Sequence, residues 1–434
     1  MRVTVVSPNR ERNPDPLLPI GASTVAALIR QLGHDVRMLD LCHEADPLPA
    51  VRWHLADWQP DLVGLSLRNL ENNQLLGHRS YLDDMRALVR TVRDVSAAPI
   101  VVGGPGYTLF PGEVLEALGL EYGLAGEAEE SLGPLLDCIE AGRPPAGIAG
   151  VCYRTGGRTV MQGVARGRSF GRSPLPAYDL LDRPAYVAQG AAIPVESKRG
   201  CDLSCSFCPD GADSSGTKLK PVSATVDEIE ALTALVGTNR LHFTDGVFHH
   251  PVGHAEELCR EIIRRSLVVR WRCGVNPVGL SLPLLQLMHE AGCRGVALGL
   301  DAATGGMLRS YRKGFRPADI AAALTAVRLA RIPYTIHILF GGPGETNESV
   351  GEALDVLEEL APDDAVFFAL GLRVFTGTAL QQTPLQEGRI LPGHNMLDPT
   401  YYLSRALDDR LPERLKERCA GHARWCSPPY ETQG

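Results

Sequence analysis

Two consecutive series of alternating strand and helix patterns constrain the fold of this chain more than any other sequence feature. Short β-branched runs and amphipathic stretches follow one another along most of the 434 residues. Strands that alternate with helices through short loops form parallel sheets covered by helices. At about 100–200 residues per domain, the length allows two to four domains. The pattern therefore predicts an α/β protein with two successive parallel sheets.

The first series occupies residues 1–145 and predicts one domain. Its expected strands are 2–6, 36–41, 61–66, 99–104 and 122–124, and its expected helices are 22–32, 81–96 and 126–141. This order is typical of a flavodoxin-like or Rossmann-like parallel sheet, whose ligands lie beyond the carboxyl ends of the strands. We therefore expect a ligand at the loops that follow Val6, Ser66, Val102 and Leu124.

The second series follows a segment, residues 146–190, that is dense in Gly, Pro, Arg and Ser and predicts a linker with a small hairpin around Gly156-Gly157. Its expected strands are 193–197, 241–244, 268–273, 295–299, 334–340 and 366–372, and its expected helices are 225–236, 254–265, 282–291, 317–330 and 347–360. Six β/α units within residues 191–385 suit a partial (β/α)6 barrel, since a full eight-unit barrel needs about 250 residues. Residues 386–434 are expected to form a small helical C-terminal segment.

Charge and hydropathy narrow the classes of partner. The formal net charge is −8, and no basic tail or stripe is present, which argues against nucleic acid or an anionic membrane as partner. No stretch approaches the roughly 20 apolar residues of a membrane span, and the N-terminus lacks the apolar core of a signal peptide. We therefore expect a cytoplasmic protein that acts on a small-molecule substrate.

Three of the eleven cysteines form a compact motif, and the other eight are scattered as incidental thiols. Cys201, Cys205 and Cys208 spell C-x3-C-x2-C directly after the first strand of the second series. A zinc site usually takes four ligands, so zinc would need a further one such as His242 or His249. Three thiolates on one loop can instead hold three irons of a 4Fe–4S cluster, which leaves the fourth iron open to an external ligand.

This motif, placed after the first strand of a β/α barrel, resembles that of the radical S-adenosylmethionine (SAM) superfamily. The resemblance implies that Cys201, Cys205 and Cys208 bind a 4Fe–4S cluster whose open iron is chelated by the amino and carboxylate groups of SAM. An electron from a donor such as flavodoxin or ferredoxin would then cleave SAM to a 5′-deoxyadenosyl radical.

The same resemblance implies candidate SAM-binding residues. Phe207 matches the aromatic residue that packs near the adenine, and Asp245 matches the second-strand position that binds the amino group. Arg272 and Asn276 end the third strand and are candidates for the ribose or the carboxylate. Structural alternatives are that Asp245 caps the next turn and that Phe207 anchors the loop.

Two later stretches match the family as well. The AGCRGVALGLD run resembles the family's "GiE" stretch, but Asp301 replaces the usual Glu and is one methylene shorter. The GGPGET run resembles the family's turn after the fifth strand, where Gly342 admits close approach of a ligand.

The first series resembles the cobalamin-binding domain often found ahead of such barrels. Three stretches carry the likeness: residues 17–36, the PDLVGLS run at 60–66, and the GGPG run at 103–106 with its later GEAE at 126–129. The resemblance implies that cobalamin is bound by residues at the strand ends, with helix N-termini near its phosphate. The candidates are Ser66, Arg68, Asn69, Gly103, Gly104, Gly126 and Glu127. The alternative is a generic flavodoxin-like domain without a ligand.

The D-x-H-x-x-G motif, which supplies a cobalt-ligating His in some cobalamin enzymes, is absent, because Asp40 and His43 have the wrong spacing. In the radical branch the lower face of the cobalt commonly lacks a His. The resemblance places the loop after the third strand, residues 67–73, beneath the cobalt.

The two resemblances together imply a cobalamin-dependent radical SAM methyltransferase that acts on an unactivated carbon, of the kind used in antibiotic and other specialised-metabolite biosynthesis. In the implied cycle, one SAM methylates reduced cobalamin and a second supplies the radical. The substrate radical then takes the methyl from methylcobalamin. Three alternatives are a non-methylating cyclisation or rearrangement with the same cofactors, a cobalamin-responsive regulatory module with a degenerate barrel, and a zinc protein. No catalytic side chain is identified from the sequence.

Overall fold

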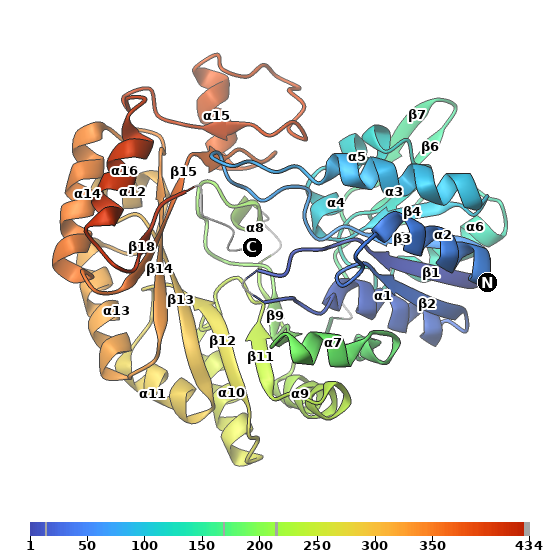
Figure 1. Cartoon of the computed structure of the whole chain (residues 1–434), viewed down its shortest axis with the longest axis horizontal. Coiled ribbons are helices and arrows are strands. Elements are labelled where there is room, and N and C mark those ends of the chain that lie inside the picture. Colours follow the sequence, from blue (N-terminus) through green and yellow to red (C-terminus); the bar gives the residue numbers. More distant parts are fainter. Residues whose placement is uncertain (14, 168–169, 213–215, 429–434) are drawn as a thin grey trace. The chain divides into compact units, whose positions relative to one another are not determined.

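The computed structural model describes the whole chain except residues 14, 168–169, 213–215 and 429–434. The chain folds into two compact units (Figure 1). The first unit contains Met1–Asn72, Arg79–Ile193 and Leu232–Thr238. The second contains Asn73–His78, Pro194–Ala231 and Asn239–Gly434. The short segment Asn73–His78 therefore belongs with the second unit although both of its flanks belong to the first.

The first unit is built on a seven-stranded sheet in the order β2-β1-β3-β4-β5-β6-β7. Its strands are β1 (Arg2–Ser7), β2 (Asp35–Asp40), β3 (Leu62–Ser66), β4 (Ile100–Gly103), β5 (Tyr122–Leu124), β6 (Val151–Thr155) and β7 (Arg158–Met161). The first five strands pair in parallel, and their order 2-1-3-4-5 is that of flavodoxin-like sheets, as predicted.

The predicted linker is wrong in part. The hairpin at Gly156-Gly157 forms, but its strands β6 and β7 extend the first sheet in antiparallel pairing. The first unit continues to Ile193, so most of the predicted linker is folded onto that unit. Its Gly and Pro content reflects tight turns on a folded surface rather than an extended connection.

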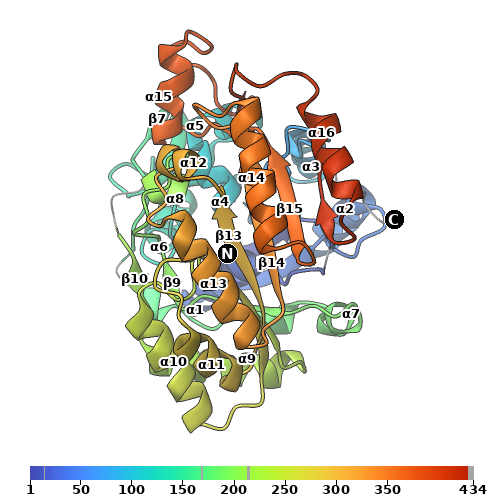
Figure 2. The same cartoon turned by 90° about the vertical axis from the view of Figure 1, so that its left-hand side faces the viewer.

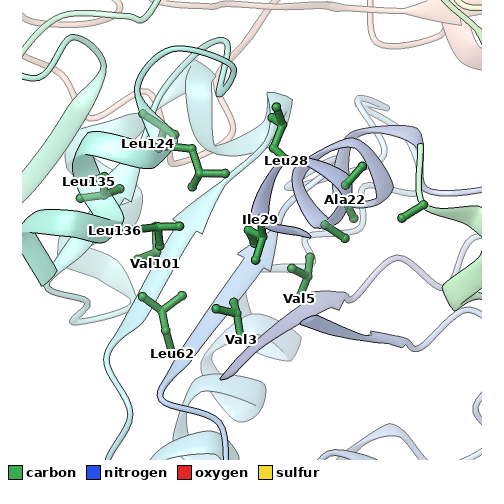
Figure 3. Packing of buried hydrophobic residues seen from close by; sticks show 14 of the residues in the cluster. Val3, Val5, Ala22, Leu28, Ile29, Leu62, Val101, Leu124, Leu135 and Leu136 are labelled. Carbon is green, nitrogen blue, oxygen red and sulfur yellow. The ribbon is translucent and has the colours of Figure 1, made fainter. Parts of the chain in front are cut away.

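Helices cover both faces of this sheet. They are α1 (Ile20–Gln31), α2 (Pro47–Trp58), α3 (Leu82–Val95), α4 (Pro105–Leu109), α5 (Pro111–Ala117), α6 (Leu132–Glu140) and α7 (Arg183–Ala188), with single 3₁₀ turns η1 (Phe170–Arg172) and η2 (Tyr178–Leu180). Figure 3 shows Ile29 of α1 and Leu135 of α6 packed over Val3 and Val101 of the sheet. Burial of these apolar side chains is the main driving force that joins helices to sheet.

Helix α6 begins at Leu132 and not at Gly126, where the sequence pattern had indicated. Gly126 has φ +92 and forms an isolated bridge with Ala165. The residues before Leu132 therefore form a turn against the Ala165 segment instead of a first helical turn.

The second unit is built on a seven-stranded sheet in the order β18-β15-β14-β13-β12-β11-β8. Its strands are β8 (Ile193–Val195), β11 (Arg240–Phe243), β12 (Arg270–Val275), β13 (Cys293–Asp301), β14 (Tyr334–Phe340), β15 (Ala365–Leu370) and β18 (Trp425–Cys426). The first six are the strands predicted for a partial (β/α)6 barrel. The C-terminal segment was predicted to be helical, but besides its helix it supplies β18, which pairs in parallel with β15.

The helices of the second unit follow the strands in sequence. They are α8 (Pro209–Ala212), α9 (Val222–Val236), α10 (Val252–Arg264), α11 (Leu282–Glu290), α12 (Gly305–Ser310), α13 (Pro317–Leu329), α14 (Asn347–Leu360), α15 (Ala379–Gln386) and α16 (Leu411–Ala420). Figure 2 shows α13 and α14 lying over the outer face of the barrel sheet. Two short ladders, β9 (Lys198–Arg199) with β10 (Lys218–Leu219) and β16 (Leu372–Arg373) with β17 (Tyr401–Tyr402), lie outside it. None of the helices in the described part of the chain is both long and apolar enough to cross a membrane.

Candidate functional site

The three-cysteine motif lies on a loop that leaves the barrel sheet after β8 and β9. Gly200, with φ +81, turns the chain out of β9, and a Cβ there would lie 2.5 Å from the Gly216 carbonyl oxygen. The thiols of Cys201, Cys205 and Cys208 are partly exposed. The loop thus presents three accessible sulfur ligands beyond the carboxyl end of the first barrel strand, as the sequence predicted.

Backbone contacts hold this loop in a defined shape. Ser206 donates its N–H to the Tyr311 carbonyl oxygen at 2.9 Å and accepts the Leu380 N–H at 2.7 Å. Tyr311 also packs edge-on against Phe207, with ring centroids 5.4 Å apart, and its hydroxyl donates to the Leu339 carbonyl oxygen at 3.1 Å. The middle of the motif is therefore anchored from two later parts of the second unit.

The donor set fits a cluster better than a single zinc ion. Within the described ranges, no group of three or more His, Cys, Asp or Glu side chains is arranged to hold one metal ion. Zinc needs such a group, because its four ligands share one ion. In a 4Fe–4S cluster each cysteine binds a different iron, so the three thiols do not have to meet at one point and need only surround the space for the cluster. Cys201, Cys205 and Cys208 lie within eight residues on one loop, which is the arrangement expected for such cluster ligands.

Burial raises the pKa of two of the thiols on the loop, Cys205 and Cys208. It raises the pKa of Cys208 to about 11, although backbone N–H groups of Gly211 and Asp210 oppose the shift. It also raises the pKa of Cys205, against the opposing charge of Lys313. Because iron binds the thiolate, cluster assembly must release these protons.

Asp245, a predicted SAM contact, lies buried beside the start of the cluster loop. Its Oδ1 accepts the N–H of Ser197 at 2.9 Å and that of Lys198 at 3.2 Å, and its Oδ2 accepts the Ser197 hydroxyl at 2.5 Å. Burial raises the pKa of Asp245 to about 6 in spite of these hydrogen bonds. The carboxylate therefore joins the end of β11 to the turn between β8 and β9, and its role toward SAM stays a prediction.

Asp245→Asn should change how the stability of the protein depends on pH. A carboxyl whose folded pKa exceeds its unfolded value of 3.8 contributes stability at low pH and loses it as pH rises through about 6. At about 1.4 kcal/mol per pKa unit, the full loss amounts to about 3 kcal/mol. Because the loss begins near pH 4, about half of it falls between pH 5 and pH 8. Thermal unfolding at pH 5 and pH 8 should show wild type losing stability relative to the Asn variant at the higher pH. An equal difference at both pH values would contradict the prediction.

Three of the other predicted SAM residues, Phe207, Asn276 and Gly342, lie beyond the carboxyl ends of barrel strands. Phe207 is on the cluster loop, and Asn276 follows β12, where its Oδ1 accepts the Val278 N–H at 2.9 Å. Gly342 follows β14, and a Cβ there would lie 2.1 Å from the Tyr311 ring, so this position requires glycine for packing. The prediction that Arg272 ends the third strand is wrong: β12 runs from Arg270 to Val275, so the partly exposed Arg272 is its third residue and only Asn276 follows the strand.

Small residues line the inner face of the central strands. Along β12 and β13, alternate residues are buried, and the residues between them are half-exposed. The half-exposed set includes Gly274, Ala297 and Gly299. A closed eight-stranded barrel fills this face with bulky side chains. Here Gly274, Ala297 and Gly299 contribute little side-chain volume to this face, which also carries Arg272.

Asp301 ends β13 and forms an ion pair that the sequence did not indicate. Its carboxylate accepts a hydrogen bond from Lys313 at 2.6 Å, and the Lys313 Nζ also lies 3.6 Å from the Cys205 sulfur. Burial alone would lower the pKa of Lys313, but the interactions of its ammonium with the Asp301 carboxylate and the Cys205 sulfur outweigh burial and raise that pKa. The candidate acid from the "GiE"-like stretch is thus paired with a lysine that contacts a cluster thiol.

The predicted cobalamin residues gather at the carboxyl ends of β3, β4 and β5 in the first unit. Ser66 pairs with Gly103 across β3 and β4. A Cβ on Gly104 would lie 2.6 Å from the Leu67 carbonyl oxygen, and one on Gly126 would lie 2.2 Å from that of Ala165. These glycines therefore let neighbouring loops approach each other closely at the edge where a ligand is expected.

Polar groups at this edge suit a large polar ligand. Arg68 and Asn69 are exposed on the loop after β3, and Glu127 donates its N–H to the Ala165 carbonyl oxygen at 3.0 Å. The predicted loop, 67–73, ends where the chain passes to the segment Asn73–His78 of the second unit. The exposed side chains of Arg68 and Asn69 at this edge fit a large polar ligand such as cobalamin.

Three contributors to the cluster loop were not predicted from the sequence: Ser197, Tyr311 and Lys313. Each acts through a contact with a residue far away along the chain. Of these three residues, only Lys313 could have been singled out from the sequence, because it is one of five lysines in a chain otherwise rich in arginine.

Two family models match the chain, one in each unit. Residues 195–357 match the model of the radical SAM superfamily, and residues 14–136 match that of the B12 binding domain. Their order and positions agree with the barrel sheet and the flavodoxin-like sheet.

Relatives match over most of the chain. A tryptophan 2-C-methyltransferase of Streptomyces laurentii is 28% identical, over 89% of this chain and 74% of its own length. A cytidylyl-2-hydroxyethylphosphonate methyltransferase of Streptomyces wedmorensis is 23% identical, over 88% of this chain and 80% of its own length.

Solved structures of the radical SAM methyltransferase TsrM from Kitasatospora setae match as well. The structure with cobalamin and a [4Fe–4S] cluster bound is 27% identical with a TM-score of 0.79, and it covers 89% of this chain and 78% of TsrM. The structure with tryptophan and a SAM analogue bound is 25% identical with a TM-score of 0.82, over 97% and 88% respectively. Both units of the present chain thus have counterparts in one solved enzyme.

Proposed function

We propose that this chain, which belongs to the cobalamin-dependent radical SAM enzymes, transfers a methyl group from SAM to a carbon atom of a small molecule. The observation that carries the proposal is a C-x3-C-x2-C loop at the carboxyl end of the first barrel strand, in a chain that also contains a B12-binding unit. Both TsrM and the relatives reported above are methyltransferases.

The residues of the second unit hold and shield the reacting groups. Cys201, Cys205 and Cys208 would ligate the cluster, and the anchored Ser206 keeps them on a fixed loop. The cluster and SAM together supply radical chemistry, and cobalamin supplies a methyl carrier, which no amino-acid side chain provides. The small residues Gly274, Ala297 and Gly299 of β12 and β13 would leave room for the bound groups. Exclusion of water from these groups would suppress side reactions of a radical.

The cobalamin would lie at the carboxyl edge of the first sheet. We propose Ser66, Gly103, Gly104, Gly126 and Glu127 as its surroundings, because they converge at the ends of β3, β4 and β5. No D-x-H-x-x-G motif is present, so no histidine of this chain is expected on the cobalt.

Arg68 and Asn69 lie on the loop proposed to face the lower side of the cobalt. Neither an exposed guanidinium nor an amide is a strong cobalt ligand at neutral pH. We further propose that a low-potential donor such as flavodoxin or ferredoxin reduces the cluster. The substrates of the relatives support a small metabolite, and biosynthesis of an antibiotic or another specialised metabolite is the proposed setting.

A mixed-isotope assay tests the methyl transfer. The reconstituted enzyme is incubated with reductant, a metabolite extract of the source strain, and equal amounts of SAM and methyl-deuterated SAM. Methylation should yield a product doublet whose members differ by three deuterium-for-hydrogen exchanges. One SAM acts as methyl donor and another as radical source, so S-adenosylhomocysteine and 5′-deoxyadenosine should form in about equal amounts once uncoupled cleavage is subtracted.

The same assay separates the non-methylating alternative. A cyclisation or rearrangement would give 5′-deoxyadenosine without matching S-adenosylhomocysteine, and no isotopic doublet would appear. Incubation without reductant serves as the control, since it should suppress the radical products.

A further inference from the structure

We propose that Lys313 is a positioning residue for the iron–sulfur cluster. Its ammonium donates a hydrogen bond to the Cys205 sulfur and thereby raises the reduction potential of the bound cluster, and Asp301 orients the ammonium. The inference rests on the cluster part of the proposed function and is independent of methyl transfer.

The first support is the geometry of three side chains. The Lys313 Nζ lies 3.6 Å from the Cys205 sulfur and 2.6 Å from Asp301 Oδ2. The side chains of Lys313 and Asp301 are only 6% and 18% exposed. The ammonium is therefore shared between a carboxylate and a proposed cluster ligand, largely out of water.

The second support is the backbone that delivers both partners. Asp301 has φ +60, and the pairing of β13 with β14 shifts register between Gly299 and Asp301. A non-glycine residue in this left-handed region is uncommon and often marks a functional position. The Asp301 carboxylate that contacts Lys313 therefore comes from an irregular position at the end of the strand.

The third support is that three residues of one short segment, Ser310, Tyr311 and Lys313, contact the cluster loop. Ser310 and Tyr311 accept hydrogen bonds from the hydroxyl and the N–H of Ser206 at 3.1 and 2.9 Å. Lys313 reaches the adjacent Cys205, and its own N–H donates to the Leu308 carbonyl oxygen at 2.9 Å. The lysine is thus held at a fixed place relative to the loop.

A fixed cation beside a cluster ligand affects electron uptake. Reduction adds one negative charge to the cluster, and a hydrogen bond to a ligand sulfur stabilises that charge. Burial strengthens the interaction, because the local dielectric is lower than that of water. The Asp301 carboxylate acts in the opposite sense, so the two residues should shift the potential in opposite directions.

The test is a redox titration of the anaerobically reconstituted full-length protein without SAM, followed by electron paramagnetic resonance of the reduced cluster. Lys313→Met removes the cation with little change of volume and should lower the midpoint potential. Asp301→Asn removes the anion and should raise it. Lys313→Arg retains the cation and should stay nearer to wild type than Lys313→Met.

Lys220→Met is the matched control, because Lys220 and Glu228 form another buried lysine–carboxylate pair, with side chains 7% and 8% exposed. Its midpoint should equal that of wild type. If Lys313 had only a structural role, both Lys313→Met and Lys220→Met should keep the midpoint potential of wild type and should differ from wild type only in stability.

Several results would overturn the inference. One is a wild-type midpoint in both Lys313→Met and Asp301→Asn. Another is an unchanged midpoint in Lys313→Met with weakened SAM binding, which would assign the lysine to SAM instead. If Lys313→Met assembles no cluster, the Asp301→Asn variant decides. A midpoint potential of Asp301→Asn that is not higher than that of wild type then overturns the inference. Failure of wild type itself to assemble a cluster would instead refute the proposed function.

Discussion

Cys205→Ala should abolish SAM cleavage and methyl transfer while cobalamin binding is retained. The variant removes one of three thiolates on a loop with no spare cysteine, and an iron without its ligand is lost or exchanged. We expect about four irons per wild-type chain after anaerobic reconstitution and far fewer in the variant. The cobalamin residues lie in the other compact unit, so their fold does not depend on this side chain.

The measurements are iron and sulfide content, 5′-deoxyadenosine formation, and the cobalamin absorption spectrum of the same samples. Cys138→Ala is the matched control, because Cys138 is also partly exposed but lies on α6 of the first unit. It should retain full iron content and activity. Wild type that holds zinc and negligible iron after strictly anaerobic preparation would refute the cluster assignment for Cys201, Cys205 and Cys208.

Gly104→Ala should strongly weaken cobalamin binding and destabilise the first unit. Gly104 has φ 96 and ψ 170, a region of backbone conformation that is essentially restricted to glycine. A Cβ there would lie 2.6 Å from the carbonyl oxygen and 2.9 Å from the nitrogen of Leu67, both backbone atoms that cannot rotate away. The strain and the clash together should cost about 3 kcal/mol or more.

To relieve the clash, the loop after β3, which carries Arg68 and Asn69, must move. We therefore expect a loss of cobalamin affinity as well as stability. Gly142→Ala is the control, since Gly142 also has positive φ (+61) but has no atom within 4 Å of an added Cβ. The measurements are the thermal stability and the cobalamin affinity of both variants. Equal effects of the two substitutions would show that the Leu67 contact is unimportant.

The sequence alone sufficed to predict the architecture because strand and helix periodicities are local properties. The helix 347–360 and the strand 334–340 have the predicted limits. Thr346 caps the start of the helix, and Gly341 follows the end of the strand. The C-x3-C-x2-C motif was equally readable, because its three ligands lie within eight residues. Family models and relatives confirm the radical SAM and cobalamin-dependent methyltransferase assignment.

The sequence pattern failed where pairing partners are distant. The hairpin at 151–161 was predicted to be part of a linker, but pairing of β6 with β5 adds it to the first sheet. The pattern likewise gave no sign that β18 joins β15. Strand pairing depends on hydrogen bonds between backbones brought together by the whole fold, and the residues of a short strand carry little information about their partner.

Local sequence therefore determined which chemistry the chain contains: three thiolates on one loop, a β/α barrel to carry them, and a flavodoxin-like sheet with glycines at its strand ends. Only the tertiary structure decided how individual side chains are used. It assigned Asp245 to Ser197 and Asp301 to Lys313, and it placed Lys313 at the Cys205 sulfur. The physical reason is that a charged side chain taken out of water must find a compensating partner, and that partner is chosen by proximity in the folded chain rather than by spacing along it.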